Sequence, residues 1–304
     1  MALLFAPLIY SFALSADERN DLKIGLCSID SQKVALVTGA SRGIGFATAE
    51  RLAKQGYRVY AGVRNRDFLQ QAFDEKIQIE ILDVTDRSTI QKTVSRIIER
   101  EGRLDILINN AGYALAGPLE CLTEEEILKQ MDVNFFGVIR VCQEVLPYMR
   151  KQKNGHILNV SSTQGTYGLP YGSLYTSSKA ALESLSAALS IEVLPWNIKV
   201  SIVEPGLVAT NFSIQLGSRK LEENPYESIC KTISDSSKEK REPSGLSQSP
   251  EEIALFLQAV IEDAHPQLRY QTSAAALEEV SQWITDLTGK EYSKWMKELI
   301  NLYY

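Results

Sequence analysis

Histidine and cysteine are scarce in this chain of 304 residues, which contains two histidines and four cysteines. His156 and His265 lie far apart in the sequence, and no two cysteines form a C-x-x-C pair. A structural zinc site needs several such ligands at short spacings, so we expect no metal site. Scattered cysteines of this kind are typical of small core or surface residues in a reducing compartment, which favours a cytoplasmic protein.

Basic charge is also in deficit. The formal net charge is −6, and the isoelectric point is about 5.2. A nucleic-acid-binding surface normally shows as an excess of Lys and Arg, so nucleic acid is excluded as a partner. The hydrophobic content of 44% and the charged content of 23% are those of an ordinary globular protein.

Long apolar runs are missing except at the start of the chain. Residues 1–16, MALLFAPLIYSFALSA, are apolar and end in small residues, as the core of a signal peptide does. The run lacks a positively charged start, and it is short and interrupted by proline for a membrane span. Residues 1–32 are therefore interpreted as an apolar N-terminal extension, with a membrane-associating or exported leader as the alternative.

From residue 33 onward, short apolar runs alternate with helical patterns. The predicted strands are residues 34–38, 57–63, 77–83, 104–109, 156–161, 198–204 and 268–271. The predicted helices are residues 45–55, 88–100, 124–149, 174–194 and 250–262. Continuous β-rich runs that alternate with helices indicate a parallel sheet covered on both faces. We predict an α/β fold of the Rossmann type: a doubly wound, mainly seven-stranded parallel sheet in a single domain, with ligands at the carboxyl ends of the strands.

The domain is expected to span residues 33–271 and to include one unusual insertion. Residues 213–249 are rich in Ser, Glu and Lys and poor in apolar residues. They follow the sixth strand, on the ligand side of the sheet, so we interpret them as a substrate lid; surface decoration is the alternative. Residues 272–304 have the pattern of an amphipathic helical tail that contains Trp283 and Trp295.

A glycine-rich loop joins the first strand to the first helix. Its sequence is TGASRGIG, with Gly39, Gly43 and Gly45 as the glycines. Glycines at such a turn let the backbone approach a pyrophosphate, and the N-terminus of the following helix favours its negative charge. The nucleotide-binding residues predicted here are Gly39, Ser41, Arg42, Gly43, Ile44 and Gly45.

The second strand ends without an acidic residue. A carboxylate at this point would bind the ribose 2′-hydroxyl of NAD. The sequence has Arg64 instead, and Arg42 in the glycine loop offers a second cation for a 2′-phosphate. NADP(H) is therefore favoured over NAD(H) as the cofactor, although both arginines could simply be solvated.

Two further strand ends carry residues suited to the nucleotide. Asp83, followed by Val84, closes the third strand, where a carboxylate can accept a hydrogen bond from the adenine amino group. The alternative is that Asp83 caps the next helix, a task for which Asp86 and Ser88 compete. Asn110, Ala111 and Gly112 close the fourth strand, where the amide could tie neighbouring strand ends together.

Tyr175 and Lys179 form the most informative pair. Their spacing of four places both side chains on one face of the predicted helix 174–194. A nearby positive charge stabilises a phenolate and so lowers the pKa of a tyrosine. Ser162 lies 13 residues before Tyr175, at the end of the fifth strand, where its hydroxyl could donate to a substrate carbonyl oxygen. Ser161 is the competing candidate, and a serine that only caps a turn is the alternative.

Taken together, these motifs resemble the catalytic type of the short-chain dehydrogenase/reductase family. The set consists of TGASRGIG, NNAG, Asn134, Ser162, Tyr175-x-x-x-Lys179 and Pro205-Gly206, and the resemblance covers about residues 33–270. It implies that Tyr175 is the general acid in reduction and the base in oxidation, and that Ser162 orients the substrate carbonyl. Lys179 would hold the nicotinamide ribose and lower the pKa of Tyr175.

The resemblance implies further roles by position. Asn134 would hold a water in a proton relay toward Lys179; its alternative is a residue at a helix kink. Pro205, Gly206 and the Val208 backbone would seat the nicotinamide, and Thr210 would hold its carboxamide or the phosphates. The helices at 124–149 and 174–194 would pair subunits, which predicts a homo-oligomer.

The implied function is an NADP(H)-dependent oxidoreductase that interconverts a carbonyl and an alcohol on an apolar substrate. Residues 110–120 and 266–270, with Asp286, Gly289 and Tyr292 beyond, are similar to the branch of 17β-hydroxysteroid dehydrogenase type 1 and photoreceptor-type retinol dehydrogenase. That likeness suggests a steroid-, retinoid- or lipid-like substrate. The alternatives are a 3-oxoacyl carrier-protein reductase and a non-catalytic nucleotide-sensing regulator.

Overall fold

The computed structural model describes residues 32–69, 73–210, 212–221, 225–238, 247–284 and 294. The N-terminal extension, most of the tail beyond Ile284 and parts of the insertion lie outside this range. The proposed role of residues 1–31 in membrane association, and the residues Asp286, Gly289, Tyr292 and Trp295, therefore lie outside the described part. No helix among the described residues is both long and apolar enough to cross a membrane.

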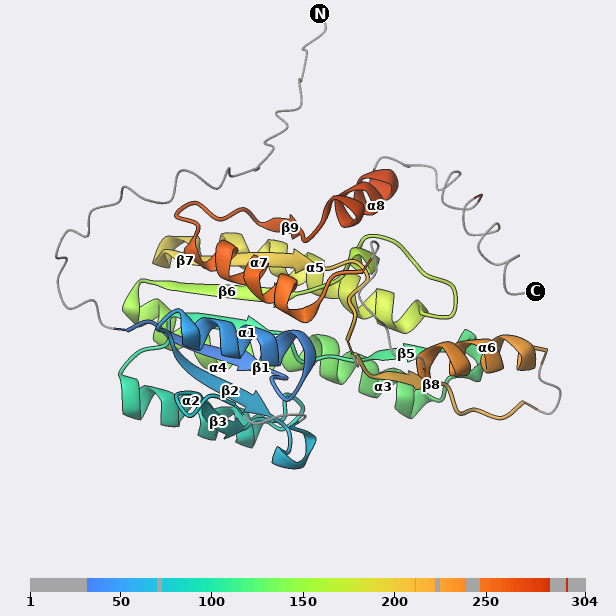
Figure 1. Cartoon of the computed structure of the whole chain (residues 1–304), viewed down its shortest axis with the longest axis horizontal. Helices are drawn as coiled ribbons and strands as arrows, with labels where there is room; N and C mark the ends of the chain where they lie inside the picture. Colours follow the sequence, from blue (N-terminus) through green and yellow to red (C-terminus); the bar gives the residue numbers. More distant parts are fainter. Residues whose placement is uncertain are drawn as a thin grey trace, which may run out of the picture. The chain divides into compact units, whose positions relative to one another are not determined.

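A seven-stranded sheet forms the centre of the domain (Figure 1). Every neighbouring pair of its strands is parallel, and the strand order is β3-β2-β1-β4-β6-β7-β9. This confirms the predicted Rossmann-type fold. The strands are β1 Val34–Thr38, β2 Arg58–Val63, β3 Gln78–Ile81, β4 Ile106–Asn109, β6 Gly155–Val160, β7 Ile198–Glu204 and β9 Arg269–Gln271.

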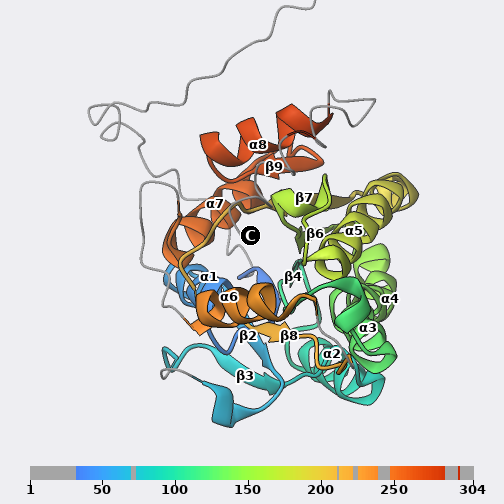
Figure 2. The same ribbon diagram turned by 90° about the vertical axis from the view of Figure 1, so that its right-hand side faces the viewer.

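Helices cover both faces of the sheet (Figure 2). One face carries α1 (Gly43–Lys54) and α7 (Pro250–Glu262), and the other carries α2 (Arg87–Glu101), α4 (Gly137–Gln152) and α5 (Ser173–Glu192). Short 3-10 turns occur at Arg66–Phe68, Leu119–Cys121, Thr163–Gly165 and Leu194–Trp196.

The alternation of side chains along the strands creates two cores. In β1, Val34 and Leu36 pack toward α2, α4 and α5, whereas Ala35 and Val37 pack toward α1 and α7. All five residues of β1 are buried. A strand buried on both faces has no polar side to show, which is why these strands read as continuous apolar runs in the sequence.

The helix predicted over residues 124–149 is present as a continuous helical segment that contains one π-helical turn. The structure has α3 (Glu124–Met131), a π-helical turn (Asp132–Phe136) and then α4. Asn134 lies in the π-helical turn, and its side chain bonds to the backbone of Tyr113 instead of facing solvent. Insertions of this kind within helices are frequent at functional sites. A capping box formed by Thr123 and Glu126 begins α3.

The insertion at 213–249 contains regular structure that the sequence did not reveal. Its first residues form β8 (Ile214–Leu216), which pairs in parallel with β5 (Ala114–Ala116) outside the main sheet. The helix α6 (Glu227–Lys238) follows. Both strands have three residues, too few for an alternating pattern to be recognised. After the last strand, α8 (Ala274–Ile284) begins the predicted helical tail.

Candidate active site

A cleft of about 1010 Å³ opens at the carboxyl ends of the strands. Parallel sheets of this type bind ligands at that edge. The cleft is lined by eighteen of the predicted residues: Gly39, Ser41, Arg42, Gly43, Ile44, Arg64, Asp83, Val84, Asn110, Ala111, Gly112, Ser162, Tyr175, Lys179, Pro205, Gly206, Val208 and Thr210. Gly45 and Asn134 are buried behind its wall.

The glycine loop is shaped by close approaches that only glycine allows. Gly39 has φ of +65°, and a Cβ there would lie 2.7 Å from the Cα of Ala111. A Cβ on Gly45 would lie 2.5 Å from the Asn110 amide nitrogen and 2.6 Å from the Gly39 carbonyl oxygen. The loop therefore brings α1 and the end of β4 into contact at the same point.

The first turn of α1 is open to an anion. Its N-cap residue, Arg42, makes no side-chain capping bond, and no acidic residue occupies the first turn. The N–H groups of this turn thus point toward the cleft without a side chain of the described residues capping them. An uncapped helix N-terminus carries partial positive charge and suits a phosphate group.

At the nucleotide end of the cleft, Asn110 holds the ends of β4 and β1 together. Its amide nitrogen donates to the carbonyl oxygens of Thr38 at 3.0 Å and Gly39 at 3.1 Å. The backbone N–H groups of Asn110 and Ala111 both donate to Thr38 Oγ1 at 3.1 Å. The tie between strand ends expected from the amide side chain is therefore present.

Asp83 is not the N-cap of the following helix, α2. Asp86 is the N-cap of α2 and accepts from the Ser88 N–H at 2.8 Å. Asp83 instead accepts from the backbone and hydroxyl of Thr85, at 2.9 and 2.7 Å, and lines the cleft. Arg42 and Arg64 are exposed at the same end of the cleft, and the residue directly after β2 is Arg64, not a carboxylate.

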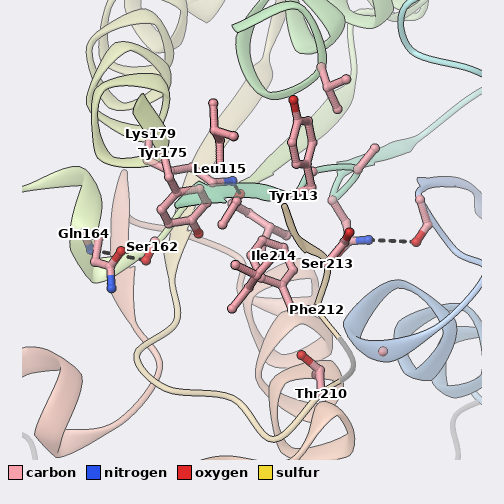
Figure 3. Close-up of a pocket in the computed structure, with 18 of the residues that line it drawn as sticks. Tyr113, Leu115, Ser162, Gln164, Tyr175, Lys179, Thr210, Phe212, Ser213 and Ile214 are labelled. Atoms are coloured by element: carbon pink, nitrogen blue, oxygen red, sulfur yellow. Dashed lines mark hydrogen bonds between the residues drawn. The ribbon is translucent and has the colours of Figure 1, made fainter. Parts of the chain in front are cut away.

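Tyr175 and Lys179 extend from the first two turns of α5 (Figure 3). Lys179 is 5% exposed, and its Nζ donates to the Val160 carbonyl at 2.8 Å and lies 5.8 Å from the centre of the Tyr175 ring. Burial lowers the pKa of Lys179 to about 8, against the attraction of Glu183, which raises it. The predicted pair is therefore a real contact, and burial makes its ammonium less stable than that of an exposed lysine.

Ser162 faces the same part of the cleft as the Tyr175 phenol (Figure 3). Its Oγ accepts from the Gln164 N–H at 3.2 Å and so caps the turn Thr163–Gly165. A hydroxyl that accepts in this way keeps its own proton to donate to a ligand. Ser161 Oγ is buried against Gly165 and has no hydrogen-bond partner among the described residues, so Ser162 is the better placed of the two.

Asn134 supports the site from behind. It is 1% exposed, and its amide nitrogen donates to the Tyr113 carbonyl at 2.9 Å and to Ser178 Oγ at 3.1 Å. Its Oδ1 accepts from the Tyr113 N–H at 3.1 Å. Asn134 thus lies at an irregular turn of the helix, as the alternative interpretation predicted. The water relay toward Lys179 stays a prediction.

The wall opposite Ser162 was missed by sequence reasoning. Figure 3 shows Phe212 and Ile214 on the far side of Tyr175 from Ser162, with Leu115 nearby. The Phe212 ring meets the Tyr175 ring edge-on at 5.9 Å. Leu115 belongs to β5, whereas Phe212 directly precedes the insertion and Ile214 lies in it. The two segments are about 100 residues apart, so no local pattern could have joined them.

The sheet, the open helix N-terminus and the Ser162–Tyr175–Lys179 group define a nicotinamide-dependent oxidoreductase. Residues 33–221 match the family model described as short chain dehydrogenase. The chain therefore belongs to the short-chain dehydrogenase/reductase family, whose members act on CH–OH groups with NAD(P).

Individual relatives have different substrates. The chain is 45% identical over 181 residues to a 3-ketodihydrosphingosine reductase of Bacteroides thetaiotaomicron, a match that covers 60% of this chain and 66% of that one. It is 32% identical to human 17-beta-hydroxysteroid dehydrogenase type 1, with 86% and 84% covered. The comparisons therefore establish the family and leave its branch unresolved.

One similar protein of known structure was crystallised with its cofactor. A short chain dehydrogenase from Burkholderia cenocepacia, crystallised in complex with NADP, superposes with a TM-score of 0.67. It is 26% identical, with 84% of this chain and 94% of that chain covered. Among the described residues, no cluster of His, Cys, Asp and Glu could hold a metal ion.

Proposed function

We propose that this protein is an NADP(H)-dependent oxidoreductase that interconverts a carbonyl and an alcohol on an apolar, lipid-like substrate. The observation that carries the proposal is the joint placement of Ser162 and Tyr175 beside an apolar wall in one cleft. Steroid and retinoid ketones or alcohols belong to the same class of substrate.

The residues at the nucleotide end fit the cofactor. The approaches at Gly39 and Gly45 shape the loop for a pyrophosphate, and the open turn of α1 favours its charge. Arg42 and Arg64 offer guanidinium groups suited to a 2′-phosphate. The nucleotide, when bound, supplies the hydride.

The protein's own task is to place the carbonyl and move a proton. The Ser162 hydroxyl would donate to the carbonyl oxygen and hold it beside the Tyr175 phenol. In reduction, Tyr175 would give its proton to that oxygen as negative charge develops there. The positive charge of Lys179 would stabilise the phenolate left behind. Asn134 would hold the water that returns a proton toward Lys179.

The apolar wall supports the substrate class. Leu115, Phe212 and Ile214 line one side of the cleft, and Ile233 of α6 lines it further out. Burial of apolar groups contributes about 25 cal/mol per Å², so such a wall favours a substrate with a long or bulky hydrocarbon part. A lipid-like ketone is also the substrate named for the relative at 45% identity.

A panel of ketones tests the proposal. NADPH oxidation would be measured with 3-ketodihydrosphingosine, a steroid ketone, retinal and a 3-oxoacyl carrier protein, and then with NADH. We expect turnover of at least one apolar ketone or aldehyde with NADPH preferred. A strong preference for the acyl carrier protein would favour the 3-oxoacyl reductase instead. Nucleotide binding without turnover of any compound would favour a regulator.

We also propose a homo-oligomer built on the outer surface of α5. Ile191 is 69% exposed near the end of this helix, and Leu194 is 65% exposed in the turn that follows. Large apolar side chains gathered at a surface are typical of protein interfaces. Light scattering of the purified protein at micromolar concentration would give a mass of two or more chains, and a monomeric mass would exclude the proposal.

A further inference from the structure

Behind Lys179 lies a group of buried charges that the proposed chemistry does not use. Glu183 follows Lys179 by four residues on α5, and Glu204 ends β7. Glu183 is 5% exposed and Glu204 is fully buried. Arg269, from the neighbouring edge strand β9, is the cation that reaches both. Charged groups are seldom buried unless pairing or function requires it.

The pairing within this cluster is unequal. Arg269 Nε donates to Glu183 Oε2 at 3.0 Å, but it lies 3.7 Å from Glu204 Oε1, beyond a hydrogen bond. Glu204 Oε2 accepts from Gln271 at 3.0 Å. Glu183 Oε1, Glu204 Oε1 and Ser161 Oγ are buried without a hydrogen-bond partner among the described residues. The single guanidinium of Arg269 thus pairs with two carboxylates, so its positive charge neutralises only part of the negative charge of the cluster.

The cluster touches all three segments that carry the chemistry. Glu183 lies one helical turn beyond Lys179 on the same face of α5. A Cβ on Gly165, in the turn that Ser162 caps, would lie 3.1 Å from Glu183 Cγ and 3.3 Å from its Oε1. Glu204 directly precedes Pro205, whose carbonyl accepts from the Thr163 N–H at 3.1 Å. The cluster therefore adjoins the lysine, the loop that carries Ser162 and the segment that begins at Pro205.

We propose that Glu183 is a positioning residue that keeps Lys179 in its ammonium form, and that Glu204 makes this support depend on pH. Glu183 attracts the ammonium of Lys179 and opposes the cost of its burial. Glu204 acts through Glu183: when it is ionised it shares Arg269 with Glu183, and when it is protonated Arg269 neutralises Glu183 alone. The groups that face Glu204 are Glu183 from α5, and Arg269 and Gln271 from β9.

The electrostatics of the cluster agree with this assignment. Burial raises the pKa of Glu204 to about 7, with a contribution from the charge of Glu183, while Gln271 and Arg269 oppose the rise. Burial lowers the pKa of Lys179 to about 8. The two groups therefore change charge within the same range, near neutral pH, where the Lys179 ammonium is needed.

The inference rests on the proposed role of Lys179, but its test does not need activity. The protein would be labelled with ¹³C at the lysine Cε, and the Lys179 signal would be assigned by its disappearance in Lys179→Met. We expect a titration midpoint near pH 8 in the wild type. In Glu183→Gln the midpoint should fall by about one unit, because a buried negative charge one helical turn from Lys179 has been removed. Exposed Glu192 on the same helix provides the control, and Glu192→Gln should leave the midpoint unchanged.

Glu204→Gln provides a second, independent variant. The midpoint of Lys179 should again fall, because Arg269 then neutralises Glu183 alone. The value of kcat/KM should match the wild type below about pH 6 and lie below it at pH 8, because Glu204 is already neutral in the wild type at low pH. Glu183→Asp, which keeps the charge, should restore the midpoint toward the wild-type value. Midpoints that stay within about 0.2 units of the wild type in both Gln variants would overturn the inference. An inactive protein with shifted midpoints would contradict the proposed function alone.

Discussion

The two ends of the cleft are built in different ways. The nucleotide end consists of strand ends and the loop before α1, held by backbone contacts such as those of Asn110 to Thr38 and Gly39. The substrate end is assembled from β5, from Phe212 just before the insertion, and from the helix α8, which come from distant parts of the chain. The first end is therefore fixed by the fold, whereas the second can vary without disturbing the sheet.

Tyr175→Phe should have the largest effect, because the proton donor lies where the two ends meet. We expect kcat to fall by about 10³-fold or more, while the affinity for NADPH changes little, since a general acid acts in the transition state and not in nucleotide binding. Steady-state kinetics and fluorescence titration with NADPH would measure the two quantities. Tyr148→Phe, outside the cleft, is the matched control; full activity in Tyr175→Phe would refute the mechanism.

Arg64→Asp tests the nucleotide end alone. The KM for NADPH should rise by about 10- to 100-fold, because a guanidinium that binds a phosphate is replaced by a repelling carboxylate. The KM for NADH should change much less, and so should the KM for the ketone. Arg66→Asp alters a nearby arginine that donates to the Ile79 carbonyl and does not line the cleft. An equal effect of both variants on NADPH would show that only the general charge of the surface matters.

Phe212→Ala tests the substrate end alone. Removing the ring that meets Tyr175 edge-on should raise the KM for an apolar ketone by about 10-fold, because less apolar surface of the ketone is then buried against the wall. The affinity for NADPH should be unchanged. Leu255→Ala removes an exposed apolar side chain from α7, away from the cleft, and serves as the control. Weaker nucleotide binding in Phe212→Ala would contradict the claim that the substrate end and the nucleotide end act independently.

Glu204→Gln should have the smallest effect, on stability. The folded pKa of about 7 lies above the ordinary value of 4.5, so the folded protein favours the protonated form. The stabilisation linked to that proton is full below pH 4.5 and is lost as the pH rises through 7. At pH 8 the variant, which cannot ionise, should therefore be more stable than the wild type by about 1–3 kcal/mol. Thermal melts at pH 8 and pH 4.5 would measure this, and an equal gain at both pH values would exclude ionisation as its cause.

The sequence predicted those parts of the fold and the cleft that depend on short, contiguous motifs. Gly39, Tyr175 and Lys179 lie in short motifs with fixed spacing, and the buried strands show as apolar runs, so the sheet and much of the cleft could be predicted. A helix kink at Asn134 was among the alternatives that the sequence offered, but its bond to Tyr113, 21 residues away, could not be predicted from a local pattern. The pairing of β5 with β8 and the approach of Arg269 to Glu183 likewise depend on tertiary contacts with no local pattern.

Transfer of a deuterium label tests the central claim most directly. NADPH that carries deuterium in the transferable position at C4 of its nicotinamide would be incubated with the protein and the best apolar ketone, and the alcohol analysed by mass spectrometry. The account predicts one deuterium on the carbinol carbon with the wild type and almost no product with Tyr175→Phe. An alcohol without deuterium, or equal product from the variant, would contradict it.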